Sequence, residues 1–135
     1  MPLSAFPSYD NSPLNFPVMR YSEVLLMKSE ALNELGQTSL ALVPLNAVRT
    51  RAGLAKLTSG LSQTAFRDKV LHERRMELAF EGQRWFDLVR TNNGQYGLDF
   101  LHSIGKTNAT TKHLLLPIPQ IERDRNPNLT QNPGY

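Results

Sequence analysis

Apolar side chains recur every three or four residues between Arg20 and Leu35, and this spacing constrains the fold more than any other feature of the sequence. Helix-favouring alanine, leucine, methionine and glutamate dominate the segment. Gly36 stands where a left-handed C-terminal cap is expected. The pattern predicts an amphipathic helix with one apolar stripe. The side chains on that stripe are Tyr21, Val24, Leu25, Lys28, Ala31, Leu32 and Leu35.

A second helical pattern follows almost at once. Residues 39–52 predict a helix with Thr38 or Ser39 as its N-terminal cap. Pro44 lacks an amide hydrogen and clashes with the preceding turn, so the helix either begins late, near Val43, or is kinked at the proline. Because only a short link separates the two helices, they are expected to be antiparallel neighbours.

A third helix is predicted over residues 62–81. Gly82 bends or ends it, and residues 83–90 continue as helix. The turn signal Asn92-Asn93-Gly94 then stops the helical pattern. Residues 95–113 are polar and are expected to form a loop.

Helical periodicity is missing at both ends of the chain. Residues 1–19 contain four prolines and predict an irregular lead-in, and residues 20–135 form the single predicted domain. From Leu114 onward the proline-rich sequence predicts coil lying over the helices, with a short helical turn at residues 120–124. Strand patterns are absent. The predicted class is therefore all-α, a helix pair and a further long helix followed by a long proline-rich C-terminal coil.

The composition excludes several classes of protein. The 135-residue chain has no cysteine, which excludes a disulfide framework, a thiol nucleophile and thiolate metal sites. The formal net charge is +3, but no stripe of one sign follows a helix, so nucleic-acid binding is not supported. No apolar run approaches the ~18 residues that a membrane helix needs. The first residues also lack the pattern of a signal peptide.

Combinations of side chains that predict catalysis or metal binding are also missing. His72 and Glu73 begin a zinc-protease pattern, but Met76 stands where the second histidine is required. The three histidines are scattered, and no serine–histidine–acid order or phosphate-binding glycine loop can be read. We therefore expect no catalytic residue, no metal and no cofactor.

Charged side chains between the second and fourth helical segments predict a structural ion-pair network. Glu73, Glu77 and Glu81 are spaced by four residues and share a helix face. Arginines stand close to them, and guanidinium forks suit half-buried carboxylates. The predicted members are Arg49, Arg51, Glu73, Arg74, Arg75, Glu77, Glu81, Arg84, Asp87 and Arg90.

Four aromatic residues are candidates for ligand contact. Trp85 and Phe86 suit a sugar-stacking platform, but their helical spacing with apolar neighbours favours a place in the core. Tyr9 and Tyr96 lie in predicted loops and are the remaining ligand-binding candidates.

Specific sequence blocks resemble the SusD/RagB family. They are residues 20–34 (RYSEVLLMKSEALNE), 45–54 (LNAVRTRAGL), 73–90 (ERRMELAFEGQRWFDLVR), 115–119 (LLPIP) and 126–135 (NPNLTQNPGY). The blocks occur in the order in which the family has them. Their joint occurrence is far more specific than any single motif.

The resemblance implies a non-enzymatic, cell-surface nutrient-binding lipoprotein. Such proteins sit on a SusC-like TonB-dependent transporter in the outer membrane and capture oligosaccharides or, in some members, peptides. Their frame is a set of tetratricopeptide-like helix pairs, and residues 21–35 with 40–52 would form one such pair. The segment 73–90 would brace that frame.

Two departures from the family pattern shape the hypothesis. Family members are several times longer and begin with a signal peptide and a lipidated cysteine, so this chain resembles a C-terminal fragment whose membrane contact would come only through a lipid anchor on the missing N-terminal part. The family's ligand-contacting aromatics lie mainly upstream, so none can be placed on a matched position here. The alternative hypothesis is a free-standing helical-repeat protein-interaction module. For a fragment, loss of neighbouring repeats predicts that the isolated chain self-associates or is only partly ordered, whereas the free-standing module predicts a stable fold.

Overall fold

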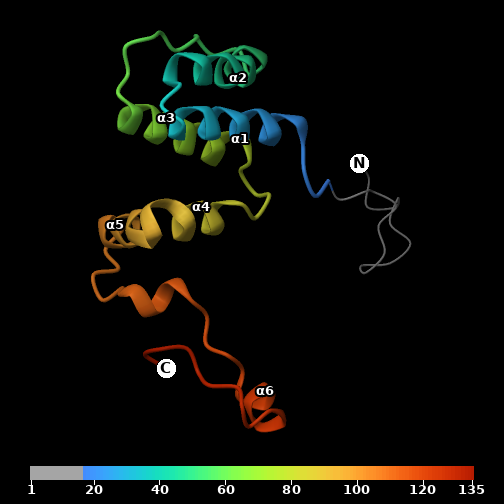
Figure 1. The fold of residues 1–135 in the computed structure, drawn as a ribbon, viewed down its shortest axis with the longest axis vertical. Coiled ribbons are helices and arrows are strands. Elements are labelled where there is room, and N and C mark those ends of the chain that lie inside the picture. The colour runs from blue at the N-terminus through green and yellow to red at the C-terminus, as the bar shows by residue number, and fades with distance from the viewer. Residues whose placement is uncertain (1–16) are drawn as a thin grey trace. The chain divides into compact units, whose positions relative to one another are not determined.

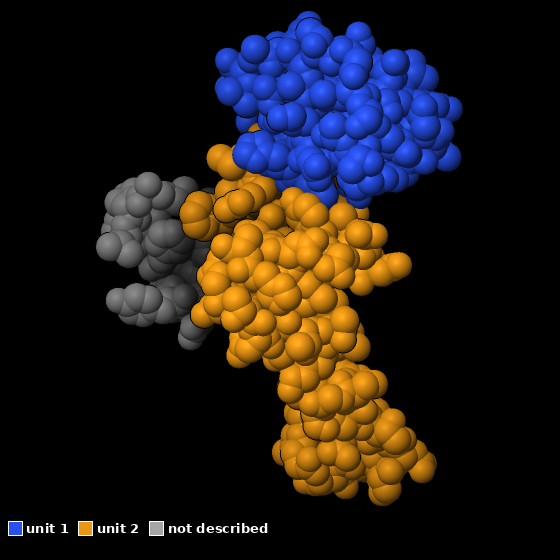
Figure 2. All heavy atoms as spheres, turned by 90° about the vertical axis from the view of Figure 1, so that its left-hand side faces the viewer, with its two compact units in different colours: residues 1–73 blue, residues 74–135 orange. Residues whose placement is uncertain are grey.

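The computed structural model describes residues 17–135, and their regular structure is helical, without a strand (Figure 1). This confirms the all-α class. The chain consists of two compact units, residues 1–73 and residues 74–135, which Figure 2 shows in different colours. The helices are α1 (Tyr21–Glu34), α2 (Thr38–Arg51), α3 (Gln63–Glu77), α4 (Arg84–Arg90), α5 (Gln95–Ser103) and α6 (Gln120–Arg125), and the 3₁₀ turns are η2 (Thr91–Gly94) and η3 (Thr111–Leu114).

The first unit is built around an apolar core shared by α1, α2 and α3. Helices α1 and α2 lie side by side (Figure 1), which agrees with the short link between them. Half-buried leucines from the helices and from the coil after α2 close the edges of this core. The buried members of the core are Leu26, Ala41, Leu45, Val48, Phe66 and Val70.

The face that α1 buries coincides with the predicted apolar stripe only in part, because Leu25 and Leu32 of that stripe are half-buried and pack against the core. Its buried side chains are Glu23, Leu26, Ser29 and Asn33, whereas 76% of Tyr21 on the predicted stripe is exposed. Hydrogen bonds explain the difference, because the buried polar groups are satisfied by the neighbouring helices. Ser29 donates to the backbone carbonyl of residue 41 (2.8 Å), and Asn33 Nδ2 donates to that of residue 63 (3.0 Å).

The ends of α1 and α2 confirm one predicted cap and correct another. Gly36 has φ +76°, and the amide of Gln37 donates to the carbonyl of Leu32 (2.9 Å), as in a left-handed helix end. The N-cap of α2 is Gln37, without a side-chain cap bond, so the predicted Thr38 or Ser39 cap is wrong. Helix α2 runs through a buried Pro44 from Thr38 onward, so the late start is wrong too.

Helix α3 ends before the predicted position. Its last residue is Glu77 rather than Glu81, because the backbone turns into the left-handed region at Phe80 (φ +67°) and again at Gly82 (φ +78°). A separate α4 follows. The predicted helix over residues 62–81 is therefore confirmed, but its predicted C-terminal end lies four residues too far along the chain.

The predicted loop over residues 95–113 is wrong in its first half, which forms α5. Asn92 and Asn93 adopt left-handed φ values and separate α5 from α4. At Gly97, an added Cβ would lie 2.9 Å from the carbonyl oxygen of Leu88. The absence of a side chain at Gly97 therefore lets α5 approach α4 closely.

Side-chain hydrogen bonds to the backbone hold the end of the second unit. Gln131 accepts from the amide of Ile118 (2.8 Å) and donates to its carbonyl (3.0 Å). Tyr135 Oη donates to the carbonyl of Leu115 (2.9 Å), with that of Lys112 at 3.1 Å. Helix α6 forms where a short turn was predicted. That the whole proline-rich segment forms a coil over the helices stays a prediction.

Among residues 17–135, no helix combines the length and the hydropathy needed to cross a membrane.

Candidate functional site

In the first unit, a half-buried ion pair joins α2 to α3. Arg49 Nη1 lies 2.6 Å from Glu73 Oε2, and their side chains are 18% and 5% exposed. Arg49 Nε also donates to the backbone carbonyl of Ala55 (3.0 Å). One arginine thereby ties the coil after α2 to the helical core.

A second, more exposed pair joins α1 to α3. Arg67 donates through Nε and Nη2 to the two carboxylate oxygens of Glu34, at 2.7 and 2.6 Å. The hydrogen bonds from Arg67 lower the pKa of the Glu34 carboxyl below its ordinary value of 4.5, and the same contact raises the pKa of Arg67. The two members of this pair are far apart in sequence and match no motif, so local sequence patterns do not predict their contact.

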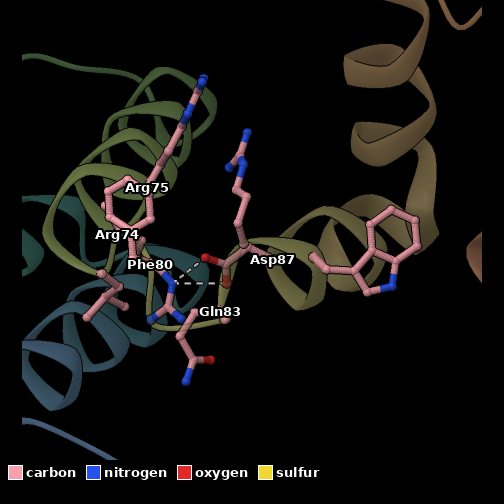
Figure 3. A pocket seen from close by; sticks show the side chains of 10 residues that line it. Arg74, Arg75, Phe80, Gln83 and Asp87 are labelled. Atoms are coloured by element: carbon pink, nitrogen blue, oxygen red, sulfur yellow. Dashed lines mark hydrogen bonds and ion pairs between the residues drawn. The ribbon is translucent and has the colours of Figure 1, made fainter. Parts of the chain in front are cut away.

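The second unit contains a buried carboxylate held by two arginines. Asp87 on α4 is 1% exposed. Arg74 Nε lies 3.0 and 2.9 Å from its two oxygens, drawn as dashed lines in Figure 3. Arg90 Nη2 donates to Oδ1 of the same group (2.7 Å). Two guanidinium groups thus balance a charge that burial would otherwise make very unfavourable.

Arg74 and Asp87 line a pocket of about 350 Å³. Its wall includes the exposed ring of Phe80, whose residue is 107% exposed and has a left-handed backbone. Arg75 points away from Asp87 in Figure 3. The lining residues are Arg74, Arg75, Leu78, Ala79, Phe80, Gly82, Gln83, Arg84, Trp85 and Asp87.

Two of the predicted network arginines contact aromatic rings. The guanidinium carbons of Arg75 and Arg84 lie 5.8 and 5.2 Å from the ring centre of Phe100 on α5. Arg84 also lies 5.7 Å from the ring centre of Tyr96. Its Nε and Nη1 are buried without a hydrogen-bond acceptor in the described part of the chain. Cation–π contact is the interaction that the structure gives this group.

The remaining members of the predicted network occupy separate places. Arg51 lies exposed at the end of α2, Glu77 is half-buried at the end of α3, and Glu81 is half-buried in the turn before α4. The structure therefore brings Arg49 to Glu73, and it brings Arg74 and Arg90 to Asp87. The single network proposed from sequence stays a prediction for the other members.

The aromatic residues differ from expectation. Trp85 and Phe86 are 38% and 63% exposed, so the core interpretation is wrong, because the short helix α4 buries Asp87 and Leu88 instead. Tyr96 lies half-buried in α5 rather than in a loop. Tyr9 falls outside the described residues.

The geometry of the buried carboxylates favours a structural role over a catalytic one. The Asp87 carboxylate is already paired with two cations, and the Glu73 carboxylate with one. A general base must lie within hydrogen-bond reach of the proton that it abstracts, and the contacts of these two carboxylates are with guanidinium groups. In the described segment 17–135, no three His, Cys, Asp or Glu side chains gather as metal ligands.

Comparison with known proteins gives one consistent result. The sequence profile of the SusD family matches residues 4–135. The SusD-like protein P2 of Formosa agariphila is 39% identical over 92% of this chain and 26% of its own length. The SusD-like protein P38 of the same organism is 36% identical over 96% of this chain and 26% of its own length.

Solved structures agree with the sequence relatives. A SusD homolog from Bacteroides thetaiotaomicron is 33% identical, with a TM-score of 0.72 over 93% of this chain and 29% of its own. A SusD superfamily protein from Bacteroides vulgatus is 29% identical, with a TM-score of 0.73 over 87% of this chain and 27% of its own. The chain spans about a quarter of the length of the curated relatives it matches.

Proposed function

This chain belongs to the SusD family, and we propose that it is the C-terminal scaffold part of a cell-surface glycan-binding protein. The proposal is carried by the share of this chain that the family profile matches, taken together with the share of each relative that this chain matches. The family profile matches nearly the whole chain, whereas the chain matches only about a quarter of its relatives. A part of this kind contributes helices to a larger binding protein.

The paired charges support the scaffold role. Arg49 with Glu73 joins two helices and the following coil, and Arg74 with Asp87 joins α3 to α4. Buried ion pairs of this kind fix the register of helices more reliably than they add stability. Because these groups are engaged in structure, the proposal is a binding protein without catalytic activity.

The proposed partners follow from family membership. The larger protein would deliver oligosaccharides to a SusC-like TonB-dependent transporter, and it would be exposed at the surface of the outer membrane. Membrane contact would come from a lipid anchor outside the residues of this chain. The free-standing interaction module is not favoured, because the family match covers nearly all of the sequence.

Glycan binding by the chain alone tests the scaffold role. Isothermal titration with maltoheptaose, xylohexaose and laminarihexaose is expected to give no heat of binding at millimolar ligand. The same titrations on a chimera, in which this chain replaces the matching quarter of the SusD-like protein P2, should reproduce the pattern of P2 itself.

Two results would contradict the proposal. Submillimolar binding by the 135-residue chain would place a glycan site within it, against a scaffold role. Release of shorter sugars from any of the three oligosaccharides would make the chain an enzyme.

A further inference from the structure

The turn η2, which joins α4 to α5 (Figure 1), contains the dipeptide Asn93-Gly94. Asn93 is exposed, and it is the one asparagine in the sequence that glycine follows. Because glycine has no Cβ, its amide nitrogen is little hindered. A side-chain amide next to such a nitrogen is open to an intramolecular displacement, which proximity favours without an enzyme or a cofactor.

This displacement has two steps, and water is its only co-reactant. The backbone nitrogen of Gly94 gives up its proton and forms a bond to Cγ of Asn93. The bond from Cγ to Nδ2 breaks, and Nδ2 takes up the proton and leaves as ammonia. Water then opens the resulting five-membered succinimide. Attack at Cγ gives aspartate, and attack at the backbone carbonyl carbon gives isoaspartate, in which the main chain runs through the side chain.

The folded backbone prevents the first of these steps. Asn93 has a φ of +52° and a ψ of +35°. At this ψ the nitrogen of Gly94 points away from the Cβ of Asn93, whereas closure of the five-membered ring requires the nitrogen on the same side as Cβ. The ring therefore closes only after the turn has opened, and native proteins open locally in this way.

Packing explains why glycine stands at position 94. Gly94 is buried and has a left-handed φ of +86°, which favours glycine. A Cβ added there would overlap Cδ1 of Leu114 in η3. The fold of the second unit therefore requires the same residue that makes Asn93 reactive.

We propose that Asn93 is a self-modification site, at which the nitrogen of Gly94 displaces the side-chain amide when the turn between α4 and α5 opens. Isoaspartate adds one methylene to the main chain of this turn. An added Cβ at Gly97 would lie 2.9 Å from the carbonyl oxygen of Leu88, so α5 packs on α4 without spare room. The longer main chain disturbs this packing, and the modification keeps the turn from closing again.

Peptide mapping of the aged chain tests the site independently of glycan binding, since the reaction needs only water and this chain. The natural chain is incubated in mildly alkaline buffer, folded and, in parallel, in denaturing guanidinium chloride. Trypsin then releases residues 91–106, because it cleaves after Arg90 and after Lys106. Mass spectrometry follows the gain of about 1 Da at each asparagine. Asn92 is the matched control, since it is also exposed and left-handed but precedes asparagine.

We expect the denatured chain to convert at Asn93 and to leave Asn92 unchanged over the same time. The folded chain should convert at Asn93 at between about a thousandth and about a tenth of the denatured rate, because the reaction then requires local opening. Both products should form, and a protein isoaspartate methyltransferase labels only isoaspartate. Asn93→His, a residue type that also enters the left-handed region, should gain no mass in either condition.

Two leucine variants relate the rate to the opening of this turn. The side chain of Leu114 lies over Gly94, and Leu114→Ala should raise the rate at Asn93 in the folded chain at least about fivefold. Leu57→Ala truncates a half-buried leucine of the first unit, and it should change that rate by less than about twofold. In guanidinium chloride, both variants should react as the natural chain does.

The melting temperature separates the effect of the longer main chain from that of the new charge. Asn93→Asp supplies the charge alone, and aspartate is tolerated in the left-handed region and favoured near the start of a helix such as α5. Its melting temperature should stay within about 2 °C of that of the natural chain. The isoaspartate form, isolated by ion-exchange chromatography, should melt at least about 5 °C lower.

Each contrary result overturns the proposal. Equal rates at Asn93 and Asn92 in denaturant would show that the dipeptide is not reactive. A folded rate above about a tenth of the denatured rate would show that the fold does not restrain the reaction, and one below about a thousandth that the turn does not open. Equal acceleration by Leu114→Ala and Leu57→Ala would place the opening elsewhere. Equal melting of the isoaspartate form and Asn93→Asp would show that the turn closes again.

Discussion

The two units of the chain differ in the side chains that are most deeply buried, although each buries both apolar and charged residues. The first surrounds an apolar cluster in which Leu45 and Phe66 are completely buried. The second has a charged centre, with Asp87 enclosed by two arginines, and its last residues are held by hydrogen bonds to backbone. Apolar packing tolerates changes of shape better than a buried charge tolerates loss of its partner. The comparison predicts different responses to substitution in the two units.

The largest effect is expected at the charged centre. Asp87→Ala removes the buried carboxylate whose two oxygens accept from Arg74 Nε, and it should lower the free energy of unfolding by about 3–5 kcal/mol. Urea unfolding followed by circular dichroism measures the change. Asp68→Ala, at an exposed position, is the matched control. A loss below ~1 kcal/mol would mean that water already solvates this centre.

Truncation of the apolar core should have a somewhat smaller effect. Leu45→Ala removes a completely buried side chain, and the resulting cavity should cost about 3 kcal/mol. Leu54→Ala, 48% exposed, is expected to change stability by less than about 0.5 kcal/mol. Equal effects in the same urea titrations would contradict the assignment of the core.

The hydrogen bonds at the end of the second unit should contribute less. Tyr135→Phe removes the hydroxyl that donates to the carbonyl of Leu115 and keeps the ring. The expected loss is about 1 kcal/mol. Hydrogen exchange should show faster exchange over residues 112–118, with no change in α1. If exchange is unchanged over residues 112–118 as well as in α1, the Tyr135 hydrogen bond does not stabilise the second unit.

The smallest effect is a pH dependence in the first unit. Arg67 lowers the folded-state pKa of Glu34, so the pair stabilises the fold at pH values above the unfolded pKa near 4.5 and loses this effect as pH falls through the folded value. Because both side chains are partly exposed, the contribution should be below ~1 kcal/mol. Glu34→Gln should therefore be less stable than the natural chain at pH 7 and equally stable at pH 2. A difference that persists at pH 2 would contradict the electrostatic origin.

Local patterns predicted the helices well and their contacts less well. The spacing in residues 20–35 correctly gave a helix, and Gly36 correctly marked its end. The same spacing placed the buried face only in part, since Leu25 and Leu32 pack against the core and Tyr21 does not. At Ser29 and Asn33, hydrogen bonds to distant backbone decided the orientation.

In the candidate site too, local sequence predicted which residues take part better than it predicted their contacts. Resemblance placed Arg74 and Asp87 in one block, and both were predicted as members of an ion-pair network. Their pairing with each other was not predicted, because 13 residues and the turn between α3 and α4 separate them. Glu34 and Arg67 meet only through the packing of α1 on α3, and no local rule anticipates that contact. For α5, the polar composition suggested a loop, but Leu98 and a glycine at the contact with α4 outweighed it.

The backbone of Phe80 has a consequence for directed evolution of this chain. Its left-handed conformation suits glycine or asparagine, and its ring is fully exposed to water. Both local preferences disfavour phenylalanine at this position. A library randomised at codon 80 and sorted only for resistance to protease should therefore enrich glycine and asparagine, and the degree of enrichment would report how far the natural residue departs from the optimum for the isolated chain.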